Sequence, residues 1–244
     1  MSGSIQATLE RVIWTALTTR QAHLGQGDAL ARRYLADVAP FAALADETPA
    51  AYQALHALLQ PHEQVALLSQ DELSLIDALQ ATRLGLLHRM VATRAAEAGS
   101  DRGSGSDAAL DMIRLGHADT DEMLELVQKT KPGPFGKRTP EMGNYIGMRD
   151  GGRLIAMAGE RMRIDGYVEI SAVCVDENWR GKGLAGRLIQ ILRGEIERRG
   201  ETPFLHVFSE NRSAISLYER LGFEVCGTFV LTRVGRAESG SAGA

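Results

Sequence analysis

Residues 176–188, DENWRGKGLAGRL, join a glycine-rich turn to the start of a helical pattern, and this combination can bind phosphate. Glycines let the backbone approach a ligand closely, and the first N–H groups of a helix have no partner within the helix, so they can donate to an anion. The spacing Gly181-x-Gly183-x-x-Gly186 is that of a dinucleotide fingerprint. The segment therefore predicts a loop that holds a phosphate-bearing ligand.

The surrounding sequence does not favour a dinucleotide fold. The residues DENWR separate the preceding strand from the first glycine, and hairpins precede the loop where a dinucleotide domain would begin. Too few residues follow Gly186 to complete such a sheet. A nucleotide P-loop fits less well still, because Lys182 precedes the second glycine and no GK[ST] is present. Glu210 at the end of the next strand keeps the dinucleotide alternative open, since it could imitate the acid that binds a ribose.

The elements that must position the loop follow from periodicity. Two strands joined at Asp150-Gly151-Gly152 are expected over residues 145–162, and a third over 166–175. Strict alternation in the third strand would place Glu169, Ser171, Val173 and Val175 on one face and Val168, Ile170, Ala172 and Cys174 on the other. The later elements expected are a helix over 184–199 ended by Gly200, a strand over 203–208, a helix over 211–223 and a strand pair or bent strand over 224–234.

The segments SAVCVDENWRGKGLAGRLI and PFLHVFSENRSAISLYERLGF resemble the GNAT superfamily of acyl-CoA-dependent N-acyltransferases, in particular its FR47-like branch. The resemblance covers roughly residues 109–234 and rests on four motifs in order. These are the strand, the Arg180-x-x-Gly183-x-Ala185 loop, the Asn-x-x-Ala-x-x-Leu-Tyr helix and the Gly-Phe turn. It implies an α/β fold of the α+β type: a twisted, mixed, mostly antiparallel sheet with helices on both faces. It also implies acetyl-CoA as cosubstrate and no metal.

The resemblance also implies the residues that bind the cofactor. The backbone of the loop is expected to hold the pyrophosphate, and the end of the third strand to meet the pantetheine and the thioester carbonyl. The cofactor-binding residues expected are Val173, Cys174, Val175, Arg180, Gly181, Lys182, Gly183, Leu184, Ala185, Gly186, Asn211 and Tyr218. For Lys182, Arg187 and Arg212, contact with CoA phosphates and a solvated position are equally compatible with the sequence, and Asn211 could also simply cap a helix.

Two residues are expected to carry the chemistry. Tyr218 lies where the family often keeps a tyrosine that protonates the departing CoA sulfur, although its helical stripe also suits a core residue. Glu169 resembles the base position of related enzymes; it could act through water, bind the substrate ammonium or be a solvated carboxylate. His206 is expected to be a buried, hydrogen-bonded histidine rather than a base, and Cys174 is not expected to be a nucleophile.

The Pro/Gly-rich loop 131–143 is expected to shape the acceptor site through Phe135, Lys137, Arg138 and Glu141. A basic loop would favour an acceptor that carries a carboxylate, such as an amino acid or a peptide terminus.

Composition sets the class of protein. The 244 residues carry a formal net charge of −4, with 44% hydrophobic and 24% charged residues, which is ordinary for a soluble globular protein and gives no global attraction to nucleic acid or acidic lipid. No apolar run approaches the ~20 residues that cross a bilayer, and the N-terminus lacks a secretory pattern, so a cytoplasmic protein is expected. Cys174 and Cys226 are expected to be free thiols, with a disulfide left open.

Four segments are expected: an α/β segment over residues 1–96, a Gly/Ser-rich linker over 97–107, the GNAT domain over 108–236 and a disordered tail over 237–244. The first segment should contain a helix over 48–59 capped by Thr48 and strands over 63–69 and 83–93, and it is expected to be a degenerate GNAT-like half. The chain is then an N-acetyltransferase that acts on a primary amine in a ternary complex, as a monomer or homodimer. The alternative is an acyl-CoA-binding module that has lost catalysis.

Overall fold

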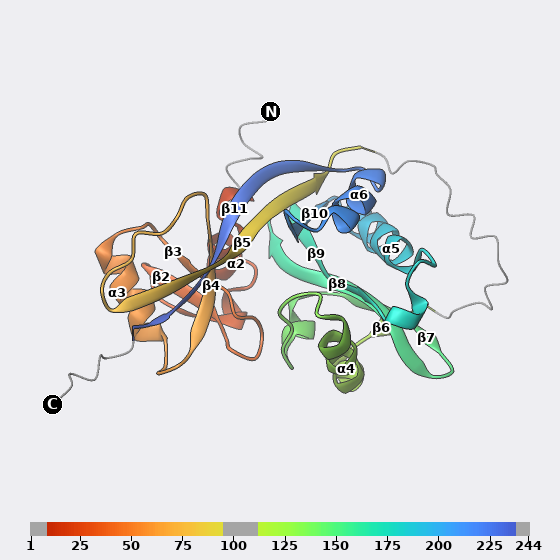
Figure 1. The fold of residues 1–244 in the computed structure, drawn as a ribbon, viewed down its shortest axis with the longest axis horizontal. Helices are drawn as coiled ribbons and strands as arrows, with labels where there is room; N and C mark the ends of the chain where they lie inside the picture. Colours follow the sequence, from red (N-terminus) through yellow and green to blue (C-terminus); the bar gives the residue numbers. More distant parts are fainter. Residues whose placement is uncertain (1–8, 95–111, 238–244) are drawn as a thin grey trace. The chain divides into compact units, whose positions relative to one another are not determined.

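The computed structural model describes residues 9–94 and 112–237, so the expected linker and residues 238–244 of the expected tail lie outside the described residues. The chain forms two compact units. One comprises the residues up to Leu35, Pro40–Leu87 and the residues from Thr228 onward; the other comprises Ala36–Ala39 and His88–Gly227. The division runs inside two long strands, β5 (Leu79–Ala92) and β11 (Phe223–Arg236), which Figure 1 draws in yellow and blue.

Among its described residues, the first unit contains a small antiparallel sheet, with strand order β1-β2-β3, and the helices α2 and α3. Its elements are α2 (Val12–Thr18), the 3-10 turn η1 (Ala22–Leu24), β1 (Gly25–Gly27), β2 (Ala31–Tyr34), β3 (Ala42–Leu44), α3 (Pro49–Leu58) and β4 (Gln64–Ser69). Helix α3 begins as expected, because Thr48 accepts a hydrogen bond from the Ala51 N–H and Pro49 occupies the first helical position. Strand β4 confirms the strand expected over 63–69 and pairs antiparallel with β11, whereas β5 begins at Leu79 rather than at residue 83.

The second unit has a mixed, mostly antiparallel sheet, as expected. From one side its strand order is β11-β5-β10-β9-β8-β7-β6; β9 and β10 are parallel, and the pairs β6–β7, β7–β8 and β8–β9 are antiparallel. Its remaining elements are β6 (Met112–Leu115), η2 (His117–Asp119), α4 (Thr120–Thr130), η3 (Thr139–Met142), β7 (Tyr145–Asp150), β8 (Arg153–Ile164), β9 (Tyr167–Val175), η4 (Glu177–Trp179), α5 (Leu184–Arg198), β10 (Thr202–Phe208) and α6 (Arg212–Arg220). Within the described residues, no helix is both long and apolar enough to span a bilayer.

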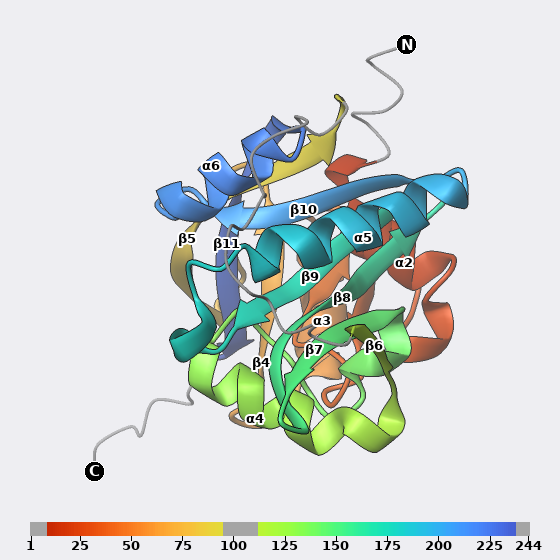
Figure 2. The same ribbon diagram turned by 90° about the vertical axis from the view of Figure 1, so that its right-hand side faces the viewer.

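Helices cover both faces of this sheet. Helix α5 packs on β8, β9 and β10, as Figure 2 shows, and its buried Leu188 and Leu192 share a core with Ile170 and Phe223. Helix α4 packs on β8 and β9 from the other face, where a second core gathers around Tyr145. Each helix therefore buries one apolar stripe against one side of the strands.

The expected alternation of side chains in β9 is wrong beyond Ser171. Val168 and Ile170 belong to the core under α5, and Val173 and Val175 pack against that same core, while Ala172 and Cys174 lie in the core under α4. The cause is a β-bulge: the register between β8 and β9 shifts between Met157 and Gly159, and Ala172 adopts φ 52°. One extra residue on β9 reverses the side to which every later side chain points.

Candidate active site

The glycine-rich loop connects the end of β9 to the start of α5. Asp176 opens the connection by accepting a hydrogen bond from the Asn178 N–H (3.1 Å), which forms η4. Gly181 and Gly183 have φ of 77° and 75°, a left-handed conformation that favours glycine. Gly183 is the N-cap of α5 and no side chain caps this helix, so the first N–H groups of α5 are left for a ligand, at the positive end of the helix dipole.

A cavity of about 500 Å³ lies beside this loop. It is lined by Val173, Cys174, Val175, Trp179, Arg180, Gly181, Gly183, Leu184, Ala185, Gly186, Gln190, Leu217, Arg220 and Leu221. The structure thus brings together nine of the residues expected to bind a cofactor. Lys182, Asn211 and Tyr218 are not among the lining residues.

The mouth of the cavity is cationic. Arg180, Lys182 and Arg187 are exposed, and the Lys182 ammonium lies 4.1 Å from the centre of the Trp179 ring, a cation–π contact that holds the side chain beside the loop. Arg220 adds a guanidinium from α6. These cations surround uncapped helix N–H groups, so the site suits a polyanion such as a pyrophosphate.

Sequence reasoning missed five lining residues: Trp179, Gln190, Leu217, Arg220 and Leu221. Helical spacing could have found Gln190, which follows Gly186 by one turn on α5. Trp179 directly precedes Arg180 in the loop, whereas Leu217, Arg220 and Leu221 depend on α6 lying next to the loop, which no local pattern specifies.

The two α6 residues expected to act are placed differently. Asn211 caps α6, since its Oδ1 accepts a hydrogen bond from the Ala214 N–H at 3.2 Å. Tyr218 packs its ring edge against Phe223, with centroids 6.3 Å apart, and its neighbour Leu217 lines the cavity. Burial raises the pKa of Tyr218 to about 12, so its hydroxyl stays protonated at neutral pH.

Glu169 is fully buried and ion-paired, and it does not line the cavity. Arg161 donates to both carboxylate oxygens (2.8 and 2.6 Å), and His206 Nδ1 lies 2.8 Å from Oε1. Desolvation by itself would raise the pKa of Glu169, but the charge and hydrogen bonds of Arg161 and the contact with His206 hold it well below its ordinary value. Glu169 is therefore an ionised carboxylate in a closed cluster, not a solvated strand-end group.

Cys174 is buried and Cys226 is half-buried, and both are free thiols. Burial raises the pKa of Cys174 to about 11, although hydrogen bonds from its surroundings partly oppose this. A thiol that stays protonated is a poor nucleophile, which agrees with the expectation from sequence.

The loop expected to shape the acceptor site is fastened to residues 36–39. The Arg138 N–H donates to the Asp37 carbonyl, and the Thr139 hydroxyl donates to the Val38 carbonyl. The Arg138 guanidinium forms a fork with the Glu141 carboxylate (both 2.8 Å), so these two expected contacts neutralise each other, while Lys137 is exposed. Phe135 lies edge-on to Tyr145 with ring centroids 5.7 Å apart, so the loop reaches the core under α4.

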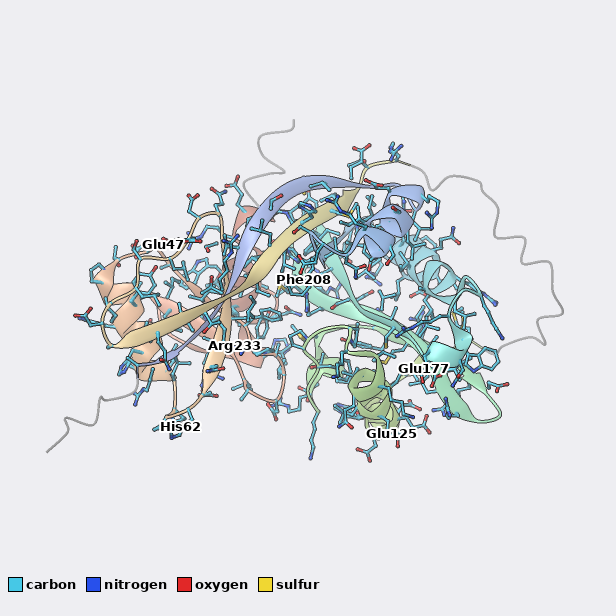
Figure 3. All side chains as sticks on the ribbon, in the orientation of Figure 1. Glu47, His62, Glu125, Glu177, Phe208 and Arg233 are labelled. Carbon is cyan, nitrogen blue, oxygen red and sulfur yellow. The ribbon has the colours of Figure 1, made fainter. Side chains whose placement is uncertain are left out.

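The cationic cavity and the buried Arg161–Glu169–His206 cluster lie in different parts of the second unit. Figure 3 marks Glu177 in η4, next to the cationic loop, and Phe208 at the end of β10. The cationic cavity lies on the side of α5 and α6, and the Arg161–Glu169–His206 cluster lies among β8, β9 and β10. The cavity that suits a polyanion and the buried Arg161–Glu169–His206 cluster are therefore separate sets of residues.

This chain is similar to known proteins in its sequence and in its three-dimensional structure. Residues 145–231, which include every cavity-lining residue, match the FR47-like protein family. A crystal structure of an acetyltransferase from the GNAT family of Novosphingobium aromaticivorans is 35% identical, covers 94% of this chain and 98% of its own, and has a TM-score of 0.83.

Two curated relatives match over little more than a third of this chain. The N-acetyltransferase YobR of Bacillus subtilis is 38% identical over 88 residues, and the N-alpha-acetyltransferase RimI of Mycobacterium tuberculosis is 32% identical over 100 residues. These matches span 35% of YobR and 62% of RimI, and 36% and 39% of this chain.

Proposed function

The chain belongs to the GNAT family of N-acetyltransferases, and from this premise we propose that it transfers the acetyl group of acetyl-CoA to a primary amine of a small molecule or peptide, directly and within a ternary complex. The observation that carries the proposal is the meeting of β9, the loop 180–186 and α6 around one cavity. The cavity volume of about 500 Å³ is within the range of pockets that bind cofactors.

The residues of the cavity fit the chemistry of coenzyme A. The uncapped N–H groups at Gly183 and beyond suit the pyrophosphate, and Arg180, Lys182 and Arg220 supply counter-charge. The apolar walls from Val173, Val175 and Leu217 suit the pantetheine arm. Coenzyme A supplies the thioester, and these residues would bind and orient it.

The transfer needs an acid for the leaving sulfur. Coenzyme A leaves more easily as a thiol than as a thiolate, so a proton should reach its sulfur as the C–S bond breaks. The Tyr218 hydroxyl is kept protonated by burial, on a helix whose next turn lines the cavity. We assign Tyr218 this role.

The acceptor is proposed from chemistry and from relatives. RimI is an N-alpha-acetyltransferase, so a peptide with a free terminal amine is the first acceptor to screen. The ion-paired Arg138 leaves Lys137 as an exposed cation of the 131–143 loop that could meet an acceptor carboxylate. We propose a monomer or homodimer in the cytoplasm and no metal in the reaction.

The proposal is tested first by thermal unfolding with acetyl-CoA, CoA or NAD. Acetyl-CoA and CoA are expected to raise the midpoint of the wild type, because a ligand that binds only the native state stabilises it by mass action. Gly183→Trp is expected to abolish the rise. Gly166→Trp is the matched control: Gly166 has φ 78°, so it suffers the same backbone strain, but it lies in the β8–β9 turn away from the cavity.

Thiol release from acetyl-CoA with the dipeptide alanyl-alanine and a panel of amines then tests turnover. Binding without thiol release for every amine would favour the module that has lost catalysis. A midpoint raised by NAD and not by acetyl-CoA would overturn the assignment of the loop.

A further inference from the structure

We propose that His206 is the group that accepts the proton of the attacking amine, and that Glu169 and Arg161 are positioning residues that set the tautomer and orientation of its imidazole. The proposal rests on the proposed acetyl transfer. It departs from the expectation that Glu169 is the base and that His206 only fills the core.

The contacts of Glu169 are those of a fixed anion. A carboxylate that acts as base must give up its partners when it takes a proton, and protonating Glu169 would leave the Arg161 guanidinium, 12% exposed in its side chain, without its counter-charge. Both carboxylate oxygens already accept hydrogen bonds from Arg161. Glu169 is therefore a poor proton acceptor for an amine.

The same contacts define the protonation of His206. An ionised carboxylate can only accept hydrogen bonds, so Nδ1, 2.8 Å from Glu169 Oε1, carries the proton. In the neutral imidazole Nε2 is then the basic nitrogen, and proton exchange runs through it. A carboxylate that orients a histidine in this way also stabilises the imidazolium that forms when Nε2 takes a proton.

The position of His206 suits contact with an acceptor. The parallel pairing of β9 with β10 ends at Glu169 opposite Phe204, and His206 is the next residue on the Phe204 side of β10, with ring centroids 5.7 Å apart. Beyond this point β9 carries the bulge and then Val173–Val175, which line the cavity. His206 thus lies just past the paired stretch of β9 and β10, with its side chain 4% exposed, on the strand next to the one whose end lines the cavity.

Other charged and titratable groups surround the imidazole. Arg161 and Glu169 face it from β8 and β9, and Tyr145 of β7 lies within the electrostatic reach of Arg161 and Glu169. The other neighbour of β10 is β5, whose titratable side chains in the second unit are His88 and Arg89. Arg161 and Glu169 neutralise each other, so the imidazole is left as the member of the cluster with a nitrogen that can take a proton.

The step balances as follows. The amine nitrogen forms a bond to the thioester carbonyl carbon, and its proton passes to Nε2 of His206. The C–S bond breaks, and the sulfur takes the Tyr218 hydroxyl proton to give free thiol. Exchange with solvent carries a proton from the imidazolium to the phenolate and restores both residues.

The test compares pH profiles of kcat and KM for acetylation of alanyl-alanine. His206→Asn keeps a side-chain N–H near the position of Nδ1, so it can still donate to Glu169, but it has no basic nitrogen. We expect kcat to fall by about 10²-fold or more, the KM for acetyl-CoA to stay unchanged, and the loss of activity at acidic pH expected of the wild type to be replaced by a rate that rises with hydroxide. His117→Asn, at an exposed histidine of η2, is the control and should leave the profile unchanged.

Further outcomes separate the alternatives. A His206→Asn enzyme with kcat within a few-fold of wild type overturns the proposal, and loss of the acidic limb in Glu169→Gln but not in His206→Asn assigns the base to Glu169. A wild type that never releases thiol refutes the proposed transfer instead. If either variant fails to fold, ¹⁵N shifts of the wild-type imidazole decide: Nδ1 is expected to be the protonated nitrogen of the neutral ring, and a proton on Nε2 instead overturns the proposal.

Discussion

At the scale of single residues, the ion pair with Arg161 changes the role of Glu169, which the sequence suggested as a base. A charge buried without a partner is very costly, whereas the same charge in a bidentate contact is held ionised. The partner is eight residues away, across the turn between β8 and β9. The Asp165-Gly166 turn could have predicted a hairpin between these strands, and that hairpin would have placed Arg161 opposite Glu169.

Tyr218→Phe is expected to lower kcat roughly 10²-fold with little change in the KM for acetyl-CoA, because it removes the proposed proton donor and keeps the ring that packs on Phe223. The pKa of Tyr218, raised to about 12, keeps the donor protonated at all lower pH, so its ionisation should remove activity only as the pH approaches that value. Steady-state kinetics across pH check this. Tyr167→Phe, at the opposite end of β9, is the control and should leave kcat unchanged; equal effects of the two variants would contradict the assignment.

At the scale of the element, the bulge in β9 decides which side chains face the cavity. It lets Val173 and Val175 point to the same side as Ile170, although each is separated from Ile170 by an odd number of positions and strict alternation would put them on the opposite side. The structure achieves this with Ala172 at φ 52°, a conformation that costs a residue with a Cβ about 1–2 kcal/mol. Nothing in the run ISAVCV announces the bulge, because alanine has no preference for this conformation.

Ala172→Gly is expected to be nearly neutral for the free energy of unfolding, since relief of the left-handed backbone offsets the loss of one methyl group and the added freedom of the unfolded chain. Ala158→Gly, in β8 and fully buried, has no such relief and should cost about 1–2 kcal/mol. Urea denaturation of both variants measures the difference. Equal losses would mean that the bulge carries no backbone strain.

At the scale of the whole molecule, β5 links the two parts of the sequence that were expected to be separate. Its last residues, His88–Ala92, belong to the second unit, where the strand lies between β11 and β10, and Met90 is fully buried in the core under α5. The expected GNAT domain of residues 108–236 lacks this strand. The expectation that residues 1–96 are a degenerate GNAT-like half stays a prediction.

A fragment of residues 108–236 is therefore expected to aggregate or to unfold without cooperativity, because β10 and β11 would each expose an unpaired edge and the core would lose Met90. The full chain with a protease site inserted between residues 97 and 107 is the matched comparison. After cleavage its two pieces should stay together in size-exclusion chromatography, since β5 remains in the sheet. A fragment 108–236 that unfolds cooperatively near the midpoint of the full chain would show that β5 is dispensable.

The sequence by itself determined what is local. The helices α3, α5 and α6, the hairpin at Gly151 and the glycine loop before α5 were all predicted, because capping, periodicity and turn chemistry act within a few residues. The same local motifs carried the family and nine of the cavity-lining residues.

Only the tertiary structure decided what depends on partners far apart in the chain. Burial of Glu169 against His206 and the insertion of β5 between β10 and β11 arise from strand order and register, and the contact of Arg138 with Asp37 joins two distant segments of the chain. These are set by the free energy of packing the whole sheet, to which a single residue contributes too little to mark its partner in the sequence. For that reason the cofactor loop was visible in the sequence, and the group proposed to take the proton was not.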